Sequence, residues 1–133
     1  MSPPSRSSRW LRCYVAGPIQ GKDGADASRE AMTANAEMAI AVGQLLIQNQ
    51  IAAFVPHLSV WWDTLHPGNS WEAWLQLDEA WIEVADAVLR IPGESRGADR
   101  EVELAIALGI PVFYSVTDLL KRRETWIAQK NVS

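Results

Sequence analysis

The sequence has few of the features that mark secreted, membrane-spanning or zinc-binding proteins. Cys13 is its only cysteine among 133 residues, so the chain can form neither an internal disulfide nor a cysteine-based zinc cluster. No apolar run reaches the roughly 18 residues of a membrane-spanning helix, and none follows the Ser/Pro/Arg-rich start as it would in a secretory signal. These absences predict a cytoplasmic protein that does not span a membrane.

Basic charge is also scarce, while the apolar content is ordinary. Twelve Lys and Arg stand against 16 Asp and Glu, and this net charge of −4 argues against a dedicated nucleic-acid binder. A hydrophobic fraction of 48% is typical of globular proteins. The length predicts one domain over residues 10–133, preceded by a disordered tail over residues 1–9.

Short apolar runs of strand length alternate with stretches of helical apolar spacing. The expected strands are residues 11–17, 51–55, 87–91 and 110–114. The first expected helix begins near residue 28, and the second begins after a cap at Asn69 or Ser70. The third runs from residue 98 to its end at Gly109, and the fourth follows a cap at Thr117. Residues 56–68 and 92–97 are expected to be loops. The pattern predicts a small doubly wound, flavodoxin- or Rossmann-like α/β sheet of about four to five mainly parallel strands with helices on both faces.

Asp78 lies in the middle of the apolar stripe of its expected helix, between Trp74 and Trp81. Burying a carboxylate costs free energy unless it is paired or hydrogen-bonded, so an Asp on an inner helix face requires an explanation. One interpretation is a partly exposed Asp or one paired with an Arg. The other is that the stripe lines a pocket, where apolar neighbours raise the pKa of the carboxyl group.

Glu101 is the second carboxylate of interest, expected in the first turn of the helix that follows residues 95–97. A Glu there is commonly a capping residue or one favoured by the helix dipole, and a functional role is the alternative. Glu103 projects from another face. Two carboxylates from neighbouring segments at the ligand end of a sheet are what glycosyl chemistry requires.

Two loops follow strands and precede helices, the position at which anions are bound. Ser95 and Gly97 form the second of these, for which a plain helix cap is the simplest interpretation. The first loop, Gly17-Pro18-Ile19-Gln20-Gly21, lacks the Gly-x-Gly-x-x-Gly spacing, so no dinucleotide cofactor is expected.

The order and spacing of these motifs resemble the nucleoside 2-deoxyribosyltransferase-like superfamily. Within it the chain is similar to the small deoxynucleoside 5′-monophosphate N-glycosidases and to uncharacterised DUF4406-type relatives from phages and bacteria. The resemblance spans residues 13–114. The elements that carry it are Tyr14-Val-Ala-Gly17-Pro18-Ile19, Pro56-His57, Asp78 with Ala85-Asp86, Ser95-x-Gly97-x₃-Glu101, and Ala105-x₃-Gly109-Ile110-Pro111-Val112.

The resemblance implies a role for each matching residue. Glu101 matches the nucleophile that attacks the anomeric carbon, Asp78 the carboxylate that assists protonation of the leaving base, and Tyr14 a tyrosine beside the nucleophile. The positions around the 5′ end of the sugar are matched by Gly17, Ile19, Ser95 and Gly97. A carboxylate at a helix N-terminus would remain ionised and ready to attack.

The position six residues before Glu101 bears on the substrate. Similar transferases of free nucleosides carry an Asp there, whereas this chain has Ser95, as the monophosphate hydrolases do. A Ser beside a helix N-terminus is compatible with a bound phosphate, whereas the negative charge of an Asp would repel it. Two residues depart from the pattern. Gln20 stands where similar hydrolases often carry an Arg, and Arg96 is the candidate to supply that positive charge. Asp99 stands where relatives often have a small residue, and it adds a negative charge.

Residues 59–69 are expected to lie over the base, and His57 to border the pocket. Trp61 and Trp62 would stack on a nucleobase or pack in a dimer interface. His57, Asp63 and His66 lack the tight spacing of metal ligands, so no metal is expected.

The leading hypothesis is hydrolysis of the N-glycosidic bond of a (deoxy)nucleoside 5′-monophosphate through Glu101, without a cofactor. One alternative is a 2-deoxyribosyltransferase, in which a second base takes the sugar. Another is a non-catalytic nucleotide-binding module, which Gln20 and Asp99 favour. The Trp-rich second half and the resemblance predict a homo-oligomer, a dimer or tetramer, with a shared active site.

Overall fold

The computed structural model describes residues 9–19 and 29–131 of the chain, with side chains up to residue 129. The expected tail and Gln20 therefore lie outside the described residues, apart from Arg9, whose guanidinium pairs with Asp86 at 2.6 Å. The elements in chain order are β1 (Leu11–Ala16), α1 (Arg29–Gln48), β2 (Ile51–Phe54), the 3₁₀ helix η2 (Pro56–Leu58), α2 (Ser59–Leu65), α3 (Trp71–Ile82), β3 (Ala87–Arg90), α4 (Arg96–Ala107), β4 (Val112–Phe113) and α5 (Val116–Asn131).

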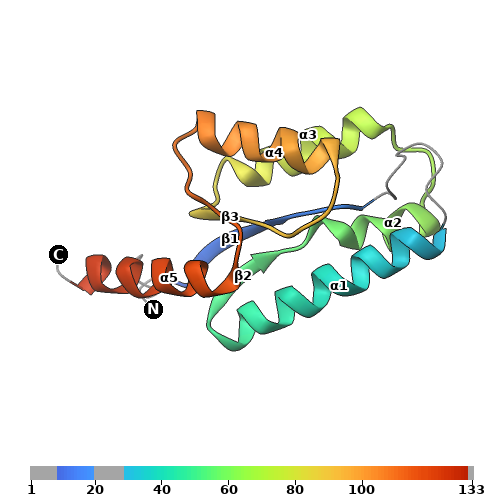
Figure 1. Cartoon of the computed structure of the whole chain (residues 1–133). Coiled ribbons are helices and arrows are strands. Elements are labelled where there is room, and N and C mark those ends of the chain that lie inside the picture. The colour runs from blue at the N-terminus through green and yellow to red at the C-terminus, as the bar shows by residue number, and fades with distance from the viewer. Residues whose placement is uncertain (1–8, 20–28, 132–133) are drawn as a thin grey trace, which may run out of the picture.

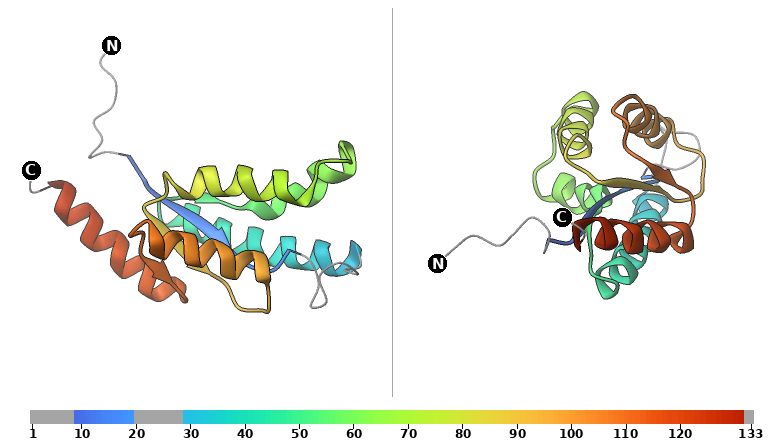
Figure 2. Two further views of the ribbon diagram at one scale, coloured as in Figure 1. Left: turned by 90° about the horizontal axis from the view of Figure 1, so that it is seen from above. Right: turned by 90° about the vertical axis from the view of Figure 1, so that its left-hand side faces the viewer.

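The four strands form one parallel sheet in the order β2-β1-β3-β4. Helices α3 and α4 lie on one face of it, and α1 and α5 on the other (Figures 1 and 2). The prediction of a small doubly wound α/β sheet is confirmed. Because the chain moves outward from β1 to β2 and then returns to β3 on the other side, the helices that follow β1 and β3 lie on opposite faces, which creates a crevice at the carboxyl ends of these two strands.

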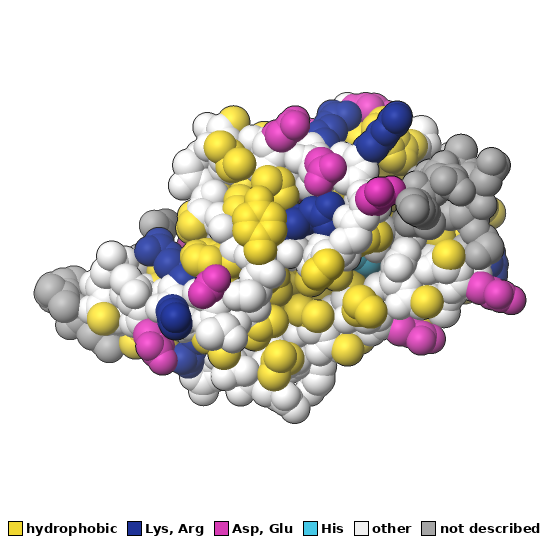
Figure 3. All heavy atoms as spheres, in the orientation of Figure 1, with side chains coloured by type: hydrophobic (Ala, Val, Ile, Leu, Met, Phe, Trp, Pro, Cys, Tyr) yellow, Lys and Arg dark blue, Asp and Glu magenta, His cyan; other side chains and the backbone are white. Residues whose placement is uncertain are grey.

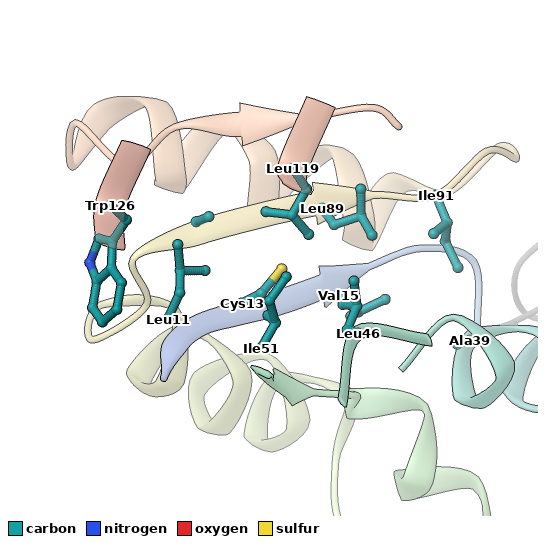
Figure 4. Close-up of a cluster of buried hydrophobic side chains, with 11 residues drawn as sticks. Leu11, Cys13, Val15, Ala39, Leu46, Ile51, Leu89, Ile91, Leu119 and Trp126 are labelled. Atoms are coloured by element: carbon teal, nitrogen blue, oxygen red, sulfur yellow. The ribbon is translucent and has the colours of Figure 1, made fainter. Parts of the chain in front are cut away.

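Alternation along β1 divides its side chains between two cores. Leu11, Cys13 and Val15 point toward α1 and α5, where they pack with a larger cluster (Figure 4) that includes Leu46, Ile51, Leu89, Leu119 and Trp126. Tyr14 and Ala16 point toward α3 and α4. Cys13 is 1% exposed, and burial raises the pKa of its thiol to about 12, so Cys13 packs in the larger cluster as a small neutral side chain.

The prediction of a loop over residues 56–68 is wrong for residues 56–65, which form η2 and α2, and holds only for residues 66–68. A proline at the first helical position is compatible with helix, and nothing between Ser59 and Leu65 breaks one. The helix after β4 also begins differently: Ser115 Oγ, not Thr117, accepts the capping hydrogen bond, from Asp118 N at 3.2 Å. Gly109 ends α4 with φ of +75°, as expected.

The surface carries charges of both signs. On the face in Figure 3, Lys and Arg side chains alternate with Asp and Glu side chains, and hydrophobic side chains lie between them. Among the residues described, no helix is both long enough and apolar enough to cross a membrane.

Candidate active site

A cavity of about 930 Å³ lies at the carboxyl ends of β1 and β3. Its walls come from the loop after β1, from α1 and α2, from the inner face of α3, and from the loop after β3 with the start of α4. This is the crevice that the strand order creates, and it is where open α/β sheets bind ligands. Asp78 and Glu101 are both among its lining residues.

Three polar side chains meet on the inner side of this cavity. The Tyr14 hydroxyl donates a hydrogen bond to Glu101 Oε2, and it also acts as a hydrogen-bond partner of Asp78. Tyr14 is 1% exposed, Glu101 5% and Asp78 7%, so all three have lost nearly all contact with water. We call Tyr14, Asp78 and Glu101 the carboxylate cluster.

Each member of the carboxylate cluster is positioned by the buried face of its element. Tyr14 projects from β1 toward α3 and α4. Asp78 shares the buried face of α3 with Leu75 and Ile82, at helical spacings of three and four. Glu101 shares that of α4 with Ala98 and Ala105 in the same way. Since α3 and α4 pack side by side, their inner faces bring both carboxyl groups to the tyrosine (Figure 2).

Burial dominates the acidity of both carboxyl groups. It raises the pKa of Asp78 to about 7, although the Tyr14 hydrogen bond opposes the shift and nearby Glu79 adds to it. It raises the pKa of Glu101 to about 8, again opposed by the Tyr14 hydrogen bond and increased by the neighbouring charges of Asp78 and Glu79. The pair therefore retains at least one proton near neutral pH.

These findings decide between the interpretations of the two carboxylates. Asp78 is buried, and among the described residues it forms no ion pair with an Arg. The prediction that Glu101 lies in the first turn is wrong: Ser95 caps α4 by accepting from Ala98 N at 3.1 Å, which places Glu101 in the second turn. The expectation that a helix N-terminus keeps Glu101 ionised fails for the same reason, because the dipole acts on the first turn and burial outweighs it.

The Tyr14 ring is held from behind by two aromatic rings. Its centroid lies 5.6 Å from that of Phe54, which stacks in turn on Trp81 at 5.5 Å. Burial and the two carboxylates raise the pKa of the Tyr14 phenol well above 10, so its oxygen keeps its proton. Tyr14 therefore acts in this cluster as a fixed hydrogen-bond donor.

Close packing fixes the two loops at the cavity edge. A Cβ atom on Gly17 would lie 2.2 Å from Ile91 Cγ1, so only glycine fits where the first loop passes the end of β3. Gly93 has φ of +126°, and a Cβ atom there would lie 2.5 Å from Pro18 Cγ. The loops after β1 and β3 thus pack directly on each other.

His57 lies beneath the first loop and does not line the cavity. It is fully buried, which lowers the pKa of its imidazole to about 4, and the nearby Pro18 and Gly17 carbonyls oppose this only in part. Neither ring nitrogen has hydrogen-bonding geometry to any described group. His57 is therefore a neutral packing residue under Gly17. Within the described part of the chain, no group of three or more His, Cys, Asp or Glu could hold a metal ion.

The structure brings together most of the residues predicted to surround the sugar. Gly17, Ile19, Ser95 and Gly97 all line the cavity with Asp78 and Glu101. Trp61 and Trp62 do not: they are 42% and 53% exposed on α2. Residues 59–65 form the helix α2 and not the expected loop. This helix presents Val60, Asp63 and Thr64 to the cavity instead of the two tryptophans.

Trp74 lines the cavity four residues from Asp78, whereas Trp81 stacks on Phe54 and does not line the cavity. Sequence reasoning missed Arg29, at the start of α1, which lines the cavity and donates to Thr64 Oγ1 at 2.8 Å. Sequence reasoning also missed Arg90. The sequence did contain an indication of its importance, because Arg90 is a charged residue at the end of an otherwise apolar strand. Arg29 and Arg96 give the cavity wall positive charges, and Asp63, Glu94 and Asp99 give it negative ones.

A family model described as a domain of unknown function, DUF4406, matches residues 11–114. The chain belongs to the DUF4406 family. The match runs from the first residue of β1 to the residue after β4, so this DUF4406 domain contains the whole sheet and every lining residue of the cavity. No curated protein and no solved structure matches the chain.

Proposed function

We propose that this DUF4406 protein hydrolyses the N-glycosidic bond of a (deoxy)nucleoside 5′-monophosphate and releases free base and sugar phosphate. The observation that supports the proposal is the carboxylate cluster: two buried carboxyl groups that lie beside one tyrosine hydroxyl and hold a proton at the wall of a ligand-sized cavity. Two carboxyl groups, one ionised and one protonated, are the minimal set for retaining glycosyl transfer.

In the proposed reaction Glu101 is the nucleophile. Its ionised carboxylate forms a bond to the anomeric carbon as the bond between that carbon and the base nitrogen breaks. Asp78 supplies the proton that the leaving base takes up. A water molecule then loses its proton to Asp78 and attacks the anomeric carbon, which frees Glu101 and restores both groups.

The reaction starts from the form in which Glu101 is ionised and Asp78 holds the proton. Because the pKa of Glu101, about 8, lies above that of Asp78, about 7, this is the minor form of the singly protonated pair, and the Tyr14 hydroxyl increases its population. A hydrogen bond donated to an ionised carboxylate is stronger than one donated to a neutral acid, so it stabilises the anion of Glu101. Positive charge that develops on the sugar lowers the pKa of Glu101 further. With pKa values of about 7 and about 8 for the pair, base release should follow a bell-shaped pH profile centred between them.

Two features of the second loop favour a 5′-monophosphate over a free nucleoside. Ser95 and Gly97 line the cavity at the start of α4, where backbone N–H groups attract anions, and Arg96 lies between them. The extra negative charge of Asp99 is offset, because its carboxylate lies 3.1 Å from the guanidinium of Arg90. That ion pair removes one of the two reasons for preferring a non-catalytic module.

The test is chromatography of ribo- and deoxynucleoside 5′-monophosphates and free nucleosides after incubation with the protein. Glu101→Gln and Asp78→Asn should abolish base release from the substrate, whereas Glu103→Gln, which alters an exposed residue of the same helix, should not. Exchange of labelled free base into the nucleotide would indicate the transferase instead. Nucleotide binding without base release in the wild-type protein would point to a binding module.

We also propose that the protein is a homo-oligomer in which a neighbouring copy covers part of the cavity mouth. Trp61, Trp62, Trp71 and Trp81 are each more than two-fifths exposed, which is a large apolar area for a domain of this size.

A further inference from the structure

Arg90 is a buried cation at the last position of a strand whose four residues are all buried. Its side chain is 10% exposed, and its guanidinium donates three hydrogen bonds. One terminal nitrogen donates to the Ile91 carbonyl, and the other donates to the Gly93 carbonyl at 2.8 Å and to Asp99 Oδ1 at 3.1 Å. A buried arginine with this many partners holds its neighbours in one arrangement.

The two carbonyl groups belong to the turn that leads from β3 into α4. This turn contains Gly93, whose φ of +126° permits the tight path, and it packs against Pro18 of the first loop. It continues directly to Ser95, the cap of α4. The third partner, Asp99, lies in the first turn of that helix. Arg90 therefore joins the end of β3, the turn and the start of α4 through one planar group.

The same group controls charge at the cavity wall. Asp99 lines the cavity and its side chain is 67% exposed, so without Arg90 it would present an unpaired negative charge to a ligand. The guanidinium also lowers the pKa of Glu101, which favours the ionised nucleophile.

We propose that Arg90 is a positioning residue that holds the turn after β3 in place for the 5′-phosphate and neutralises Asp99 there. The proposal rests on the proposed function for the identity of the anion, but the mechanical role does not depend on it. Arg90 would thus determine the preference for a monophosphate over a free nucleoside without touching the substrate.

Arg90→Lys tests the positioning role because it keeps the charge and loses the planar fork that reaches two carbonyl groups. The KM for the 5′-monophosphate should rise about tenfold, while the KM for the matching free nucleoside changes less than about twofold. Asp99→Asn should shift the monophosphate KM in the opposite direction, because it removes a negative charge and leaves the Arg90 carbonyl bonds intact. Arg100→Lys, at an exposed arginine that pairs with Glu79, is the matched control. Equal changes for both substrates would overturn the proposal.

Amide hydrogen exchange of the ligand-free protein separates this proposal from the proposed function. Arg90→Lys should speed exchange about tenfold or more in the segment from Ala98 to Asp99, whose amides donate to Ser95, and leave the amides of β1 unchanged. Unchanged protection of that segment would overturn the positioning role even if the protein is an active hydrolase. Conversely, if the wild-type protein releases no base from any compound, the proposed function fails while the exchange result still decides on Arg90.

Discussion

Replacing Glu101 by Gln should stabilise the folded protein at alkaline pH while it abolishes base release. The pKa of Glu101 is 4.5 in a solvated chain and about 8 in the fold, so the folded state binds this proton more tightly than the unfolded state does. The favourable contribution is complete below pH 4.5 and is lost as the pH rises through 8. Each pH unit in that interval lowers the free energy of unfolding by about 1.4 kcal/mol for this one group.

Glutamine has nearly the same shape, carries no charge at any pH and still accepts from the Tyr14 hydroxyl. At pH 8 it avoids the desolvation of a buried anion, and we expect a gain of about 2–4 kcal/mol in the free energy of unfolding. For a domain of this length that corresponds to a rise of roughly 5–15 °C in Tm. Near pH 4.5 the two proteins should unfold at nearly the same temperature.

The assay is thermal unfolding followed by circular dichroism at several pH values between 4.5 and 8.5. Glu103→Gln is the control, since that side chain is exposed and its Tm should follow the wild type at every pH. A Tm difference for Glu101→Gln that is the same at all pH values, or a loss of stability at pH 8, would refute the reasoning. Either result would mean that Glu101 is ionised in the fold at neutral pH.

Three further predictions concern other parts of the molecule. Tyr14→Phe removes a hydrogen bond that lowers the pKa of Glu101, so the acidic limb of the pH–rate profile should move up by about 1–2 pH units; an unmoved limb would contradict this. Gly17→Ala should lower the free energy of unfolding by about 1–3 kcal/mol in a urea titration, because the new Cβ atom would collide with Ile91. Gly97→Ala, whose Cβ atom would meet only Ser95 Oγ at 4.0 Å, should change it by less than about 0.5 kcal/mol. Sedimentation equilibrium should give a mass at least twice 14.8 kDa, and a monomer at micromolar concentration would exclude the proposed oligomer.

The fold could be predicted because its signals are local. Runs such as Leu11–Ala16 and Ala87–Arg90 are too apolar for a half-exposed strand, and the intervening helices carry their apolar residues at helical spacing. The error at residues 56–65 arose where local signals conflict. Proline and glycine mark both loops and helix ends, and only the packing of η2 and α2 against α1 selects the helical form.

The site could be predicted in part, and the limits have physical causes. Asp78 and Glu101 stood out because a carboxylate within an apolar helical stripe has to face something polar or hollow. Trp61 and Trp62 were misplaced because a helix, unlike a loop, turns consecutive side chains to different directions. The partners of Arg90 are backbone carbonyl groups and an aspartate nine residues away, and residue types do not reveal that such groups converge.

The sequence by itself determined the layers and the parallel sheet, since these follow from periodicities that each segment carries alone. Tertiary structure decided the chemistry of the carboxylate cluster. It placed Glu101 and Asp78 around one tyrosine hydroxyl and removed water from both carboxyl groups, which raised their pKa values to about 8 and about 7. Acidity depends on the surroundings of a group and not on its identity, and the surroundings exist only once β1, α3 and α4 have packed together.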